Sequence, residues 1–448
     1  MAPKEKQPLD RSFQEALRHF RRGELGKARS LAEQLLRINP AHHEALHLLG
    51  IMAYQARDLV EALALIGKAI GICPHNALFQ HSQGLVFLAM SRPEEAIAAF
   101  DRAIQLKPDY FDAFINRGNA LQRTLRPAEA VASYDLALQI KPNSPAAYNN
   151  RGVALKNRKR FDEAIASFDL AIELDPGYHE AFNNRGNALL EANRPEEAIA
   201  AYDRAIQIKP DYHEAHYNRG NALQKTMRLA EAISAFDRAI QLRPGYHDAY
   251  YNRAVTLKRM LRFDEAIASY DQALELRPDN PETFNNRGVV FQEMMRFDDA
   301  IASYEQAIRL KPDYADAFNN RGVAFQEMLR LDDAIASYEQ AVRLKPDFAD
   351  SHWNRSLALL LKGEFEQGWK HYEWRWKKEP LSSAKRDYRQ PLWLGNAPLR
   401  GKTILIYSEQ GYGDTLQFCR YARLLNELGA RVVLEVEPAL TSLLGTLE

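Results

Sequence analysis

Apolar residues recur along most of the chain in a pattern that predicts pairs of amphipathic helices. In the segment 161–174 (FDEAIASFDLAIEL), apolar residues stand three or four positions apart, with charged residues between them. This spacing places the apolar side chains on one face of an α-helix. A second helical segment is predicted just before it, at 147–158 (AYNNRGVALKNR). We therefore expect a helix, a short turn and another helix as the basic unit.

This unit returns every 34 residues, as a row of prolines shows. Ten prolines stand at that spacing, at positions 40, 74, 108, 142, 176, 210, 244, 278, 312 and 346. A fixed period of this length is typical of stacked supersecondary units, and each proline ends a second helix. We number the positions within a repeat from 1 to 34. After a leader of eight residues (1–8), ten repeats fill 9–348, and a divergent eleventh with a capping helix fills 349–382.

Small and aromatic residues occupy fixed positions in the repeats. Position 20 is Ala in all ten, position 27 is Ala in nine, and position 24 is aromatic from Phe100 to Tyr338. Position 8, in the first helix, is Gly in eight repeats: Gly50, Gly84, Gly118, Gly152, Gly186, Gly220, Gly288 and Gly322. Glycine inside a helix is less favourable than alanine by about 1 kcal/mol. We expect close packing between the paired helices to compensate for this loss.

The combination of small residues at positions 8, 20 and 27, an aromatic residue at 24 and Pro at 32 resembles the tetratricopeptide repeat (TPR). One departure is position 7, which is Arg here, whereas family members often carry Leu. The resemblance implies an all-α fold, a TPR solenoid in which antiparallel helix pairs form a right-handed superhelix. It also implies that the first helices line the concave side and that the protein binds peptides or extended segments of partner proteins.

Asparagine occupies position 6 in eight successive repeats. These residues, which we call the asparagine ladder, are Asn116, Asn150, Asn184, Asn218, Asn252, Asn286, Asn320 and Asn354. Position 6 faces away from the packed positions 4 and 8, so stacking would align the amides in one row. Because an amide both donates and accepts hydrogen bonds, such a row can bind the main chain of an extended peptide. The row resembles the inner asparagine row of the O-linked N-acetylglucosamine transferases. The alternative is a polar surface copied along by duplication.

If the ladder binds a peptide, replacing several of its members with Ala should weaken binding without lowering thermal stability.

Each ladder residue is followed by Arg: Arg117, Arg151, Arg185, Arg219, Arg253, Arg287, Arg321 and Arg355. We expect these cations to pair with acidic residues at position 2 of neighbouring helices, such as Asp112, Glu180 and Glu214. The alternative is that they bind carboxylates or phosphates of a ligand.

One pair of histidines has the sequence spacing of a zinc-binding motif. The segment His43-Glu44-Ala45-Leu46-His47 matches the H-E-x-x-H pattern of zinc proteases and places both histidines on one helical face. However, it falls on repeat positions 1–5, and His-Glu-Ala recurs at 179–181 and 213–215. We therefore predict that these histidines belong to the repeat and that the chain has no metal site.

The pattern changes after the repeats. The segment 363–380 holds three tryptophans and is predicted to be an amphipathic cap, and 383–402 is predicted to be a linker. The segments 403–407 and 431–436 are β-rich and flank a helical pattern at 415–428. This order predicts a Rossmann-like β-α-β-α segment over 403–448, with parallel strands. Two strands cannot cover their own faces, so we expect this domain to be incomplete here, as a fragment or a remnant.

A glycine-bearing turn, Gly411-Tyr412-Gly413-Asp414, follows the first of these strands. The surrounding stretch, 393–421, resembles the segment that follows the repeats in bacterial repeat–glycosyltransferase fusions, and the turn resembles that of the heptosyltransferases. This resemblance implies that the segment is the N-terminal half of a GT-B glycosyltransferase. In that case Asp414 would be the catalytic base, and Gly411 and Gly413 would form a turn that contacts the ligand. The resemblance also implies that a longer parent protein would use a nucleotide sugar as its donor. The alternative for Asp414 is a helix N-cap.

Composition narrows the functional classes. The chain has 59 Lys and Arg and 59 Asp and Glu, so its net charge of zero argues against nucleic-acid binding through a global field. Its two cysteines, Cys73 and Cys419, are far apart in sequence and fit a reducing compartment. No export signal or membrane-length apolar run is visible. We therefore predict a cytoplasmic protein-binding superhelix that needs no cofactor of its own, and alternatively part of an inverting protein O-glycosyltransferase.

Overall fold

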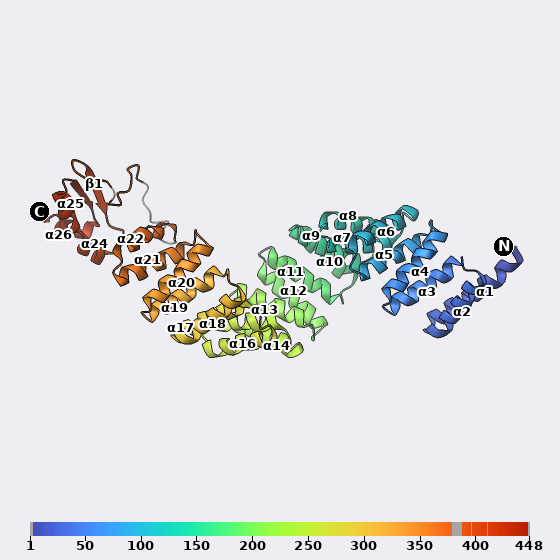
Figure 1. The fold of residues 1–448 in the computed structure, drawn as a ribbon. Coiled ribbons are helices and arrows are strands. Elements are labelled where there is room, and N and C mark those ends of the chain that lie inside the picture. Colours follow the sequence, from blue (N-terminus) through green and yellow to red (C-terminus); the bar gives the residue numbers. More distant parts are fainter. Residues whose placement is uncertain (1–2, 379–387, 396, 410, 447–448) are drawn as a thin grey trace. The chain divides into compact units, whose positions relative to one another are not determined.

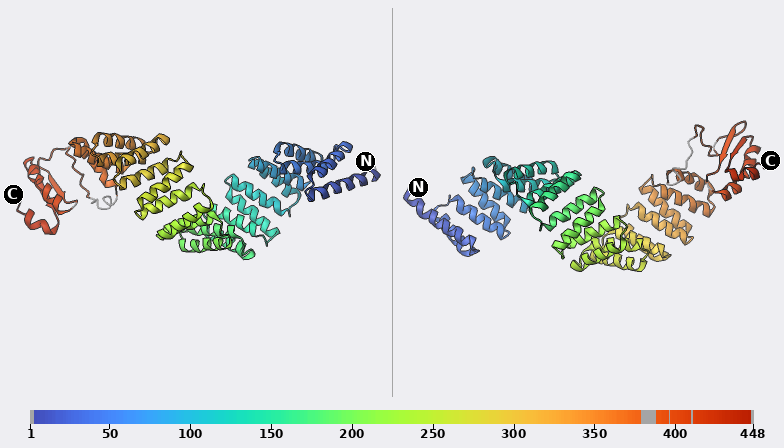
Figure 2. Two further views of the ribbon diagram at one scale, coloured as in Figure 1. Left: turned by 90° about the horizontal axis from the view of Figure 1, so that it is seen from below. Right: turned by 180° about the vertical axis from the view of Figure 1, so that it is seen from behind.

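The computed structural model describes residues 3–378, 388–395, 397–409 and 411–446. The chain divides into two compact units, residues 1–283 and 284–448. Within each unit, consecutive antiparallel helix pairs lie side by side (Figures 1 and 2). The prediction of an all-α repeat solenoid is confirmed, and the predicted leader is helical from Pro3 onward.

The two helices of each pair correspond to the two predicted segments of each repeat. The first helices are α1 (Pro3–Arg21), α3 (His43–Gln55), α5 (Ala77–Ala89), α7 (Phe111–Arg123), α9 (Pro145–Asn157), α11 (His179–Glu191), α13 (His213–Lys225), α15 (His247–Arg259), α17 (Pro281–Glu293), α19 (Ala315–Glu327) and α21 (Ala349–Lys362). The second helices are α2 (Leu25–Ile38), α4 (Leu59–Ile72), α6 (Pro93–Leu106), α8 (Pro127–Ile140), α10 (Phe161–Leu174), α12 (Pro195–Ile208), α14 (Leu229–Leu242), α16 (Phe263–Leu276), α18 (Phe297–Leu310), α20 (Leu331–Leu344) and α22 (Phe365–Tyr372).

The glycine at position 8 lies against the aromatic ring at position 24 of the same repeat. A Cβ added at Gly186 would stand 2.5 Å from Cε1 of Tyr202, and the same overlap of 2.5–2.6 Å recurs in seven repeats. The rings are fully buried, as for Tyr202. The predicted close packing at position 8 is therefore confirmed, because a larger residue would occupy the space of the ring.

First helices also contact the first helix of the next pair, as from α3 to α5 and onward to α15, and from α19 to α21. Since the outer helices of a curved stack are farther apart, this contact makes the first helices the inner layer of each unit. Position 15, in the turn within a pair, adopts a left-handed backbone conformation. It is Gly23 and Gly363 in the terminal pairs. In the nine pairs between, it is another residue with φ between 56° and 65°, as at Leu125.

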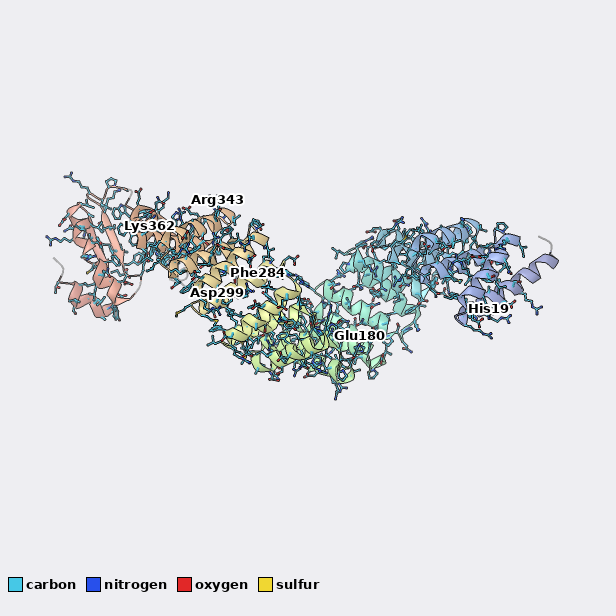
Figure 3. The ribbon with its side chains drawn as sticks, turned by 60° about the horizontal axis from the view of Figure 1, so that its bottom comes forward. His19, Glu180, Phe284, Asp299, Arg343 and Lys362 are labelled. Carbon is cyan, nitrogen blue, oxygen red and sulfur yellow. The ribbon has the colours of Figure 1, made fainter. Side chains whose placement is uncertain are left out.

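The cap closes the last repeat of unit 284–448. Helix α22 continues into the 3₁₀ helix η1 (Glu373–Lys377), and the Trp374 ring stacks on His352 of α21 with ring centroids 3.7 Å apart. Lys362, at the end of α21 (Figure 3), bridges Asp332 and Glu364 at 2.7 and 2.6 Å. The cap is thus attached by stacking and by ion pairs.

The C-terminal segment has two short parallel strands, β1 (Thr403–Tyr407) and β2 (Arg431–Glu435), paired in register from Thr403↔Arg431 to Tyr407↔Glu435. The single helix predicted between them is two helices, α24 (Tyr412–Phe418) and α25 (Tyr421–Glu427), and η2 (Pro438–Leu440) and α26 (Thr441–Leu444) follow β2. The described residues therefore contain the expected β-α-β-α order but no complete Rossmann fold. Part of the predicted linker, 383–387, lies outside the described residues.

No helix in the described ranges is both long enough and apolar enough to cross a membrane.

We predict that Gly186→Val lowers the free energy of unfolding by about 1–3 kcal/mol, because its side chain would overlap the Tyr202 ring. Valine is chosen because one repeat carries Ala254 opposite Tyr270, with both buried, so a single methyl group is tolerated there. Urea denaturation followed by circular dichroism measures the change. The control is Gly67→Val in α4, where nothing lies within 4 Å of the added Cβ. Equal effects of the two substitutions would contradict the packing account.

Candidate functional site

The asparagine ladder lies on the first helices, from Asn116 in α7 to Asn354 in α21. All eight side chains are half-buried. They therefore lie at the boundary between the packed interior and the inner surface of their unit. This position agrees with the expectation that position 6 faces away from the core of its own pair.

In seven of the eight ladder residues, the side-chain amide is also bonded to the preceding repeat. Asn184 Nδ2 donates to Asn149 Oδ1 at 3.0 Å, and Asn218 Nδ2 donates to Asn183 Oδ1 at 2.9 Å. In unit 284–448, Asn320 and Asn354 donate in the same way to Asn285 and Asn319, at 3.1 and 3.2 Å. The acceptors stand at position 5 of the preceding repeat, one residue before the ladder. The ladder is therefore a series of hydrogen bonds between repeats.

Where position 5 is not asparagine, another acceptor takes its place. Asn116 Nδ2 lies 3.0 Å from His81 Nε2, and burial lowers the pKa of His81, so its neutral ring can accept the bond. Asn150 Nδ2 donates instead to Asn119 Oδ1, at position 9, at 3.3 Å. Asn252 Nδ2 donates to both Tyr217 and Asn221, at 2.9 Å each. The connection is thus kept although the partner residue varies.

The carbonyl oxygens of the ladder are used differently from the amide nitrogens. Within the part of the chain that the structure describes, Oδ1 accepts no hydrogen bond in six ladder residues: Asn116, Asn150, Asn184, Asn218, Asn252 and Asn354. Oδ1 of Asn320 accepts a long bond from Asn319, at 3.4 Å. The bond made by Nδ2 fixes the orientation of the amide and leaves its acceptor atom for another molecule.

A buried network connects the ladder to the core ring at position 24. Tyr134 Oη donates to Asn119 Oδ1 at 2.7 Å and accepts from Gln122 Nε2 at 2.8 Å. Burial raises the pKa of the Tyr134 hydroxyl to about 12, so it stays protonated at neutral pH. Asn119 is also the acceptor for Asn150. The packed ring, the first helix and the next repeat are thus joined by side-chain hydrogen bonds.

The arginines at position 7 pair with acidic residues, but the predicted partners at position 2 were wrong. Arg151 Nε donates to Asp135 Oδ1 at 2.6 Å, and Arg219 Nε donates to Asp203 Oδ1 at 2.6 Å. These partners stand at position 25, in the second helix of the preceding repeat. Arg151 Nη1 also donates to Ser167 Oγ of its own repeat, at 2.6 Å. The arginines therefore connect successive repeats, as the ladder does on the same helices.

The two histidines of the H-E-x-x-H pattern are packed into the repeats. His47 Nε2 lies 2.8 Å from Ser82 Oγ, its ring packs on Phe79, and burial lowers its pKa to about 4. No group of three or more potential metal ligands occurs among the described residues.

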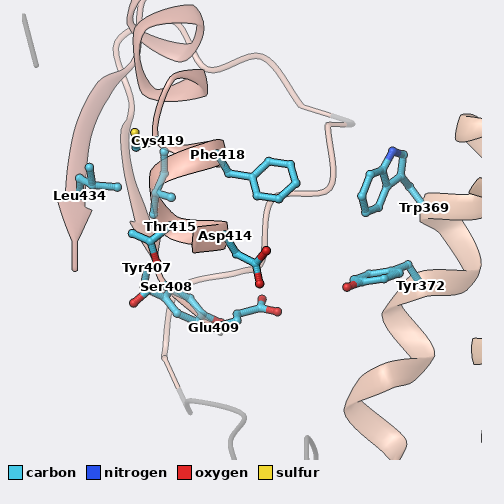
Figure 4. Close-up of a pocket in the computed structure, with 11 residues that line it drawn as sticks. Trp369, Tyr372, Tyr407, Ser408, Glu409, Asp414, Thr415, Phe418, Cys419 and Leu434 are labelled. Atoms are coloured by element: carbon cyan, nitrogen blue, oxygen red, sulfur yellow. The ribbon is translucent and has the colours of Figure 1, made fainter. Parts of the chain in front are cut away.

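Asp414 lines a cavity of about 410 Å³ at the C-terminal end of β1, facing the cap. In Figure 4, its carboxylate and that of Glu409 point into the same space, and Phe418 faces Trp369 across it. Asp414 stands in the first turn of α24, whereas the N-cap is Gly411. The alternative interpretation of Asp414 as the N-cap is therefore wrong. No neighbouring atom lies within 4 Å of a Cβ added at Gly411 or Gly413, so the turn has an open surface.

The two sides of this cavity are held together by Arg375. This residue of η1 is only 7% exposed. It donates from Nε and Nη2 to both oxygens of Glu409, at 3.1 and 3.0 Å, and from Nη1 to Glu373 at 2.6 Å. Sequence reasoning did not find Arg375, Trp369 or Tyr372 as parts of this site. The only signal was their location in the tryptophan-rich cap.

Comparison with known proteins identifies the repeats. Family models described as tetratricopeptide repeats match residues 13–77 and 81–145, then 145–178, 213–246 and 315–348, and also 167–200. A further model described as a TPR repeat matches 186–226, 262–294 and 296–328. Together these matches cover most of the chain between residues 13 and 348.

Three solved structures are similar to parts of this chain. YrrB, described as a TPR protein with an unusual peptide-binding site, is 26% identical and has a TM-score of 0.36. The match covers 43% of this chain and 98% of that one. A TPR protein from Parabacteroides merdae is 17% identical, with 56% and 99% of the two chains covered and a TM-score of 0.45. Yeast Tom70 is 13% identical, with 84% and 93% covered and a TM-score of 0.40.

Because ladder amides bond the preceding repeat, we predict that replacing one of them lowers stability, in contrast to the expectation from the sequence alone. Asn184→Ala removes the donor to Asn149, which is only 8% exposed, and should cost about 1–3 kcal/mol because a buried acceptor is left unpaired. Asn149→Ile removes the acceptor, and Ile115 already occupies position 5 in another repeat. In a double-mutant cycle measured by urea denaturation, the double variant should lose less than the sum of the single losses, by about 1 kcal/mol. Strictly additive losses would contradict the pairing.

Proposed function

The chain belongs to the tetratricopeptide repeat family, and we propose that it binds extended peptide segments of partner proteins along its asparagine ladder. The family supports protein or peptide partners in general. The observation that carries the finer proposal is the set of six ladder carbonyls that accept no hydrogen bond within the described residues. An extended peptide presents main-chain N–H groups, which are the donors that these oxygens require.

The bonds between repeats favour this use of the ladder. In the six ladder residues with a free acceptor, Nδ2 is bonded to the preceding repeat, as for Asn184 on Asn149, so the acceptor is already oriented before a peptide arrives. Such preorganisation reduces the side-chain entropy that is lost on binding. Because amide carbonyls bind main-chain N–H groups, the row would accept partners of varied sequence. A longer protein could use the same row to present a polypeptide to a catalytic domain.

We place this binding activity in the cytoplasm. Cys73 and Cys419 are both free thiols, which fits a reducing compartment.

A matched pair of variants tests the ladder. The triple variant Asn184→Ala, Asn218→Ala and Asn252→Ala removes three free acceptors, whereas Asn149→Ala with Asn183→Ala breaks two of the same bonds from the other side. Peptides selected by the parent chain from a synthetic array are titrated by fluorescence anisotropy. The ladder variant should bind at least about tenfold more weakly, since each lost hydrogen bond contributes about 0.5–1.5 kcal/mol. The control should bind more tightly than the ladder variant, because it keeps all the ladder carbonyls and loses only the bonds that orient two of them. Equal weakening in both would assign the effect to folding and contradict direct contact.

A second candidate function is that of a glycosyltransferase arm, and the cavity at Asp414 favours it. The carboxylate lines a cavity between the glycine turn and the cap, where it could accept a proton from an acceptor hydroxyl. In this proposal the repeats hold the polypeptide acceptor, the transfer inverts the sugar configuration, and a nucleotide sugar is the donor in a longer protein.

Sugar transfer tests this second function on this chain and on any longer product of its gene. A panel of nucleotide sugars is offered with a bound peptide, and glycopeptide is detected by mass spectrometry. Asp414→Asn should lower the rate at least about 100-fold, the lower range for loss of a general base. The control is Glu427→Gln, an exposed carboxylate on α25 paired with Arg423. Transfer that is unaffected by Asp414→Asn would contradict the assignment.

A further inference from the structure

The aromatic side chains that line the cavity beside Asp414 have no role in either function above. We propose that it binds a small organic cation, an alkylated ammonium group, between the cap and the glycine turn. The cavity has a volume of about 410 Å³ and is lined by aromatic rings, carboxylates and small polar groups. This volume lies within the usual range for small-molecule sites. The inference is independent of peptide binding by the ladder.

Two aromatic side chains face each other across the opening. Trp369 of α22 and Phe418 of α24 stand on opposite sides (Figure 4) and are 50% and 48% exposed. Tyr372 meets Trp369 edge-on, with ring centroids 5.2 Å apart. Large aromatic groups left open to water around a cavity offer the faces on which a cation binds. Alkyl substituents on that cation would replace water against the same rings.

The charges of the lining favour a cation. Asp414 and Glu409 are the ionisable carboxylates of the lining, which contains no Lys, Arg or His. Glu409 is paired with Arg375, and Arg375 is also paired with Glu373. Asp414 is exposed, and its carboxylate takes part in no hydrogen bond or ion pair with another described residue. Among the described residues, the carboxylates at this cavity therefore outnumber the cations, which favours an ammonium group over a phosphate.

The same features separate this ligand from a neutral sugar. Aromatic rings and carboxylates can both contact a hydroxyl-rich ring, but a neutral ligand leaves the charge of Asp414 without a partner. An alkylated ammonium group satisfies both features at once, because its charge pairs with Asp414 while its methyl groups contact Trp369 and Phe418. Its source could be a free amine or a methylated lysine side chain, which share this chemistry.

Saturation-transfer NMR titrations on the full chain test the proposal. The probes are tetramethylammonium, its neutral counterpart tert-butanol, N-acetylglucosamine and a capped trimethyl-lysine. Tetramethylammonium should bind about two- to fivefold more tightly than tert-butanol, which is the usual scale of an exposed cation–π contact. Tighter binding of the trimethyl-lysine would assign the site to a protein side chain, and equal binding would assign it to free amines.

Two variants, each with a control, complete the experiment. Trp369→Ala and Asp414→Asn should each weaken tetramethylammonium binding about two- to fivefold. Phe365→Ala, which changes an exposed ring of α22 outside the cavity, and Glu427→Gln should bind like the parent. Circular dichroism melting confirms that each variant is folded. Binding that does not distinguish cation from neutral probe, unchanged binding in both cavity variants, or preferred binding of N-acetylglucosamine would overturn the proposal.

Discussion

The contact between the glycine at position 8 and the ring at position 24 is the constraint on which the repeats depend. It recurs in seven repeats with the same distance, as at Gly186 and Tyr202. The contact fixes how closely the two helices of a pair approach, because the buried ring fills the space that a side chain would take. It also fixes how each first helix is rotated, which directs positions 5, 6 and 7 toward the neighbouring repeat. The ladder bonds and the arginine pairs both follow from that rotation.

The sequence predicted this constraint well because it acts within one repeat. The 34-residue period and the composition of each position predicted the two helices of a repeat, the proline at the end of the second helix and the packing role of the glycine. The pairing between repeats was harder, because it depends on the offset between neighbouring pairs, which sequence spacing does not contain. For this reason the sequence correctly predicted an acidic partner for Arg151 but placed it at position 2, whereas the partner is Asp135 at position 25 of the preceding repeat. For the same reason Asn149 was not recognised as the acceptor of Asn184.

In the C-terminal segment, the strands were predictable and the site was not. The apolar runs at 403–407 and 431–435 formed the expected parallel pair. The cavity, however, joins Asp414 to Trp369 and Tyr372, which precede it by more than a whole repeat length. What brings them together is the buried Arg375 with its two bonds to Glu409. An ion pair between residues that are distant in sequence produces no periodic pattern, so the sequence did not predict it. Only the tryptophan-rich composition of the cap indicated that this surface differs from the repeats.

A solenoid makes contacts almost only between neighbours, so its stability is a sum of local terms. The ladder belongs to these local terms, since seven of its amides each bond one repeat to the one before it. A peptide bound along several ladder carbonyls would add a connection that spans more than two repeats. Binding at one repeat would then favour the native stacking of the next, because the same amides bond both the preceding repeat and the peptide. Under the proposed function, binding and stability would therefore be coupled through the same set of side chains.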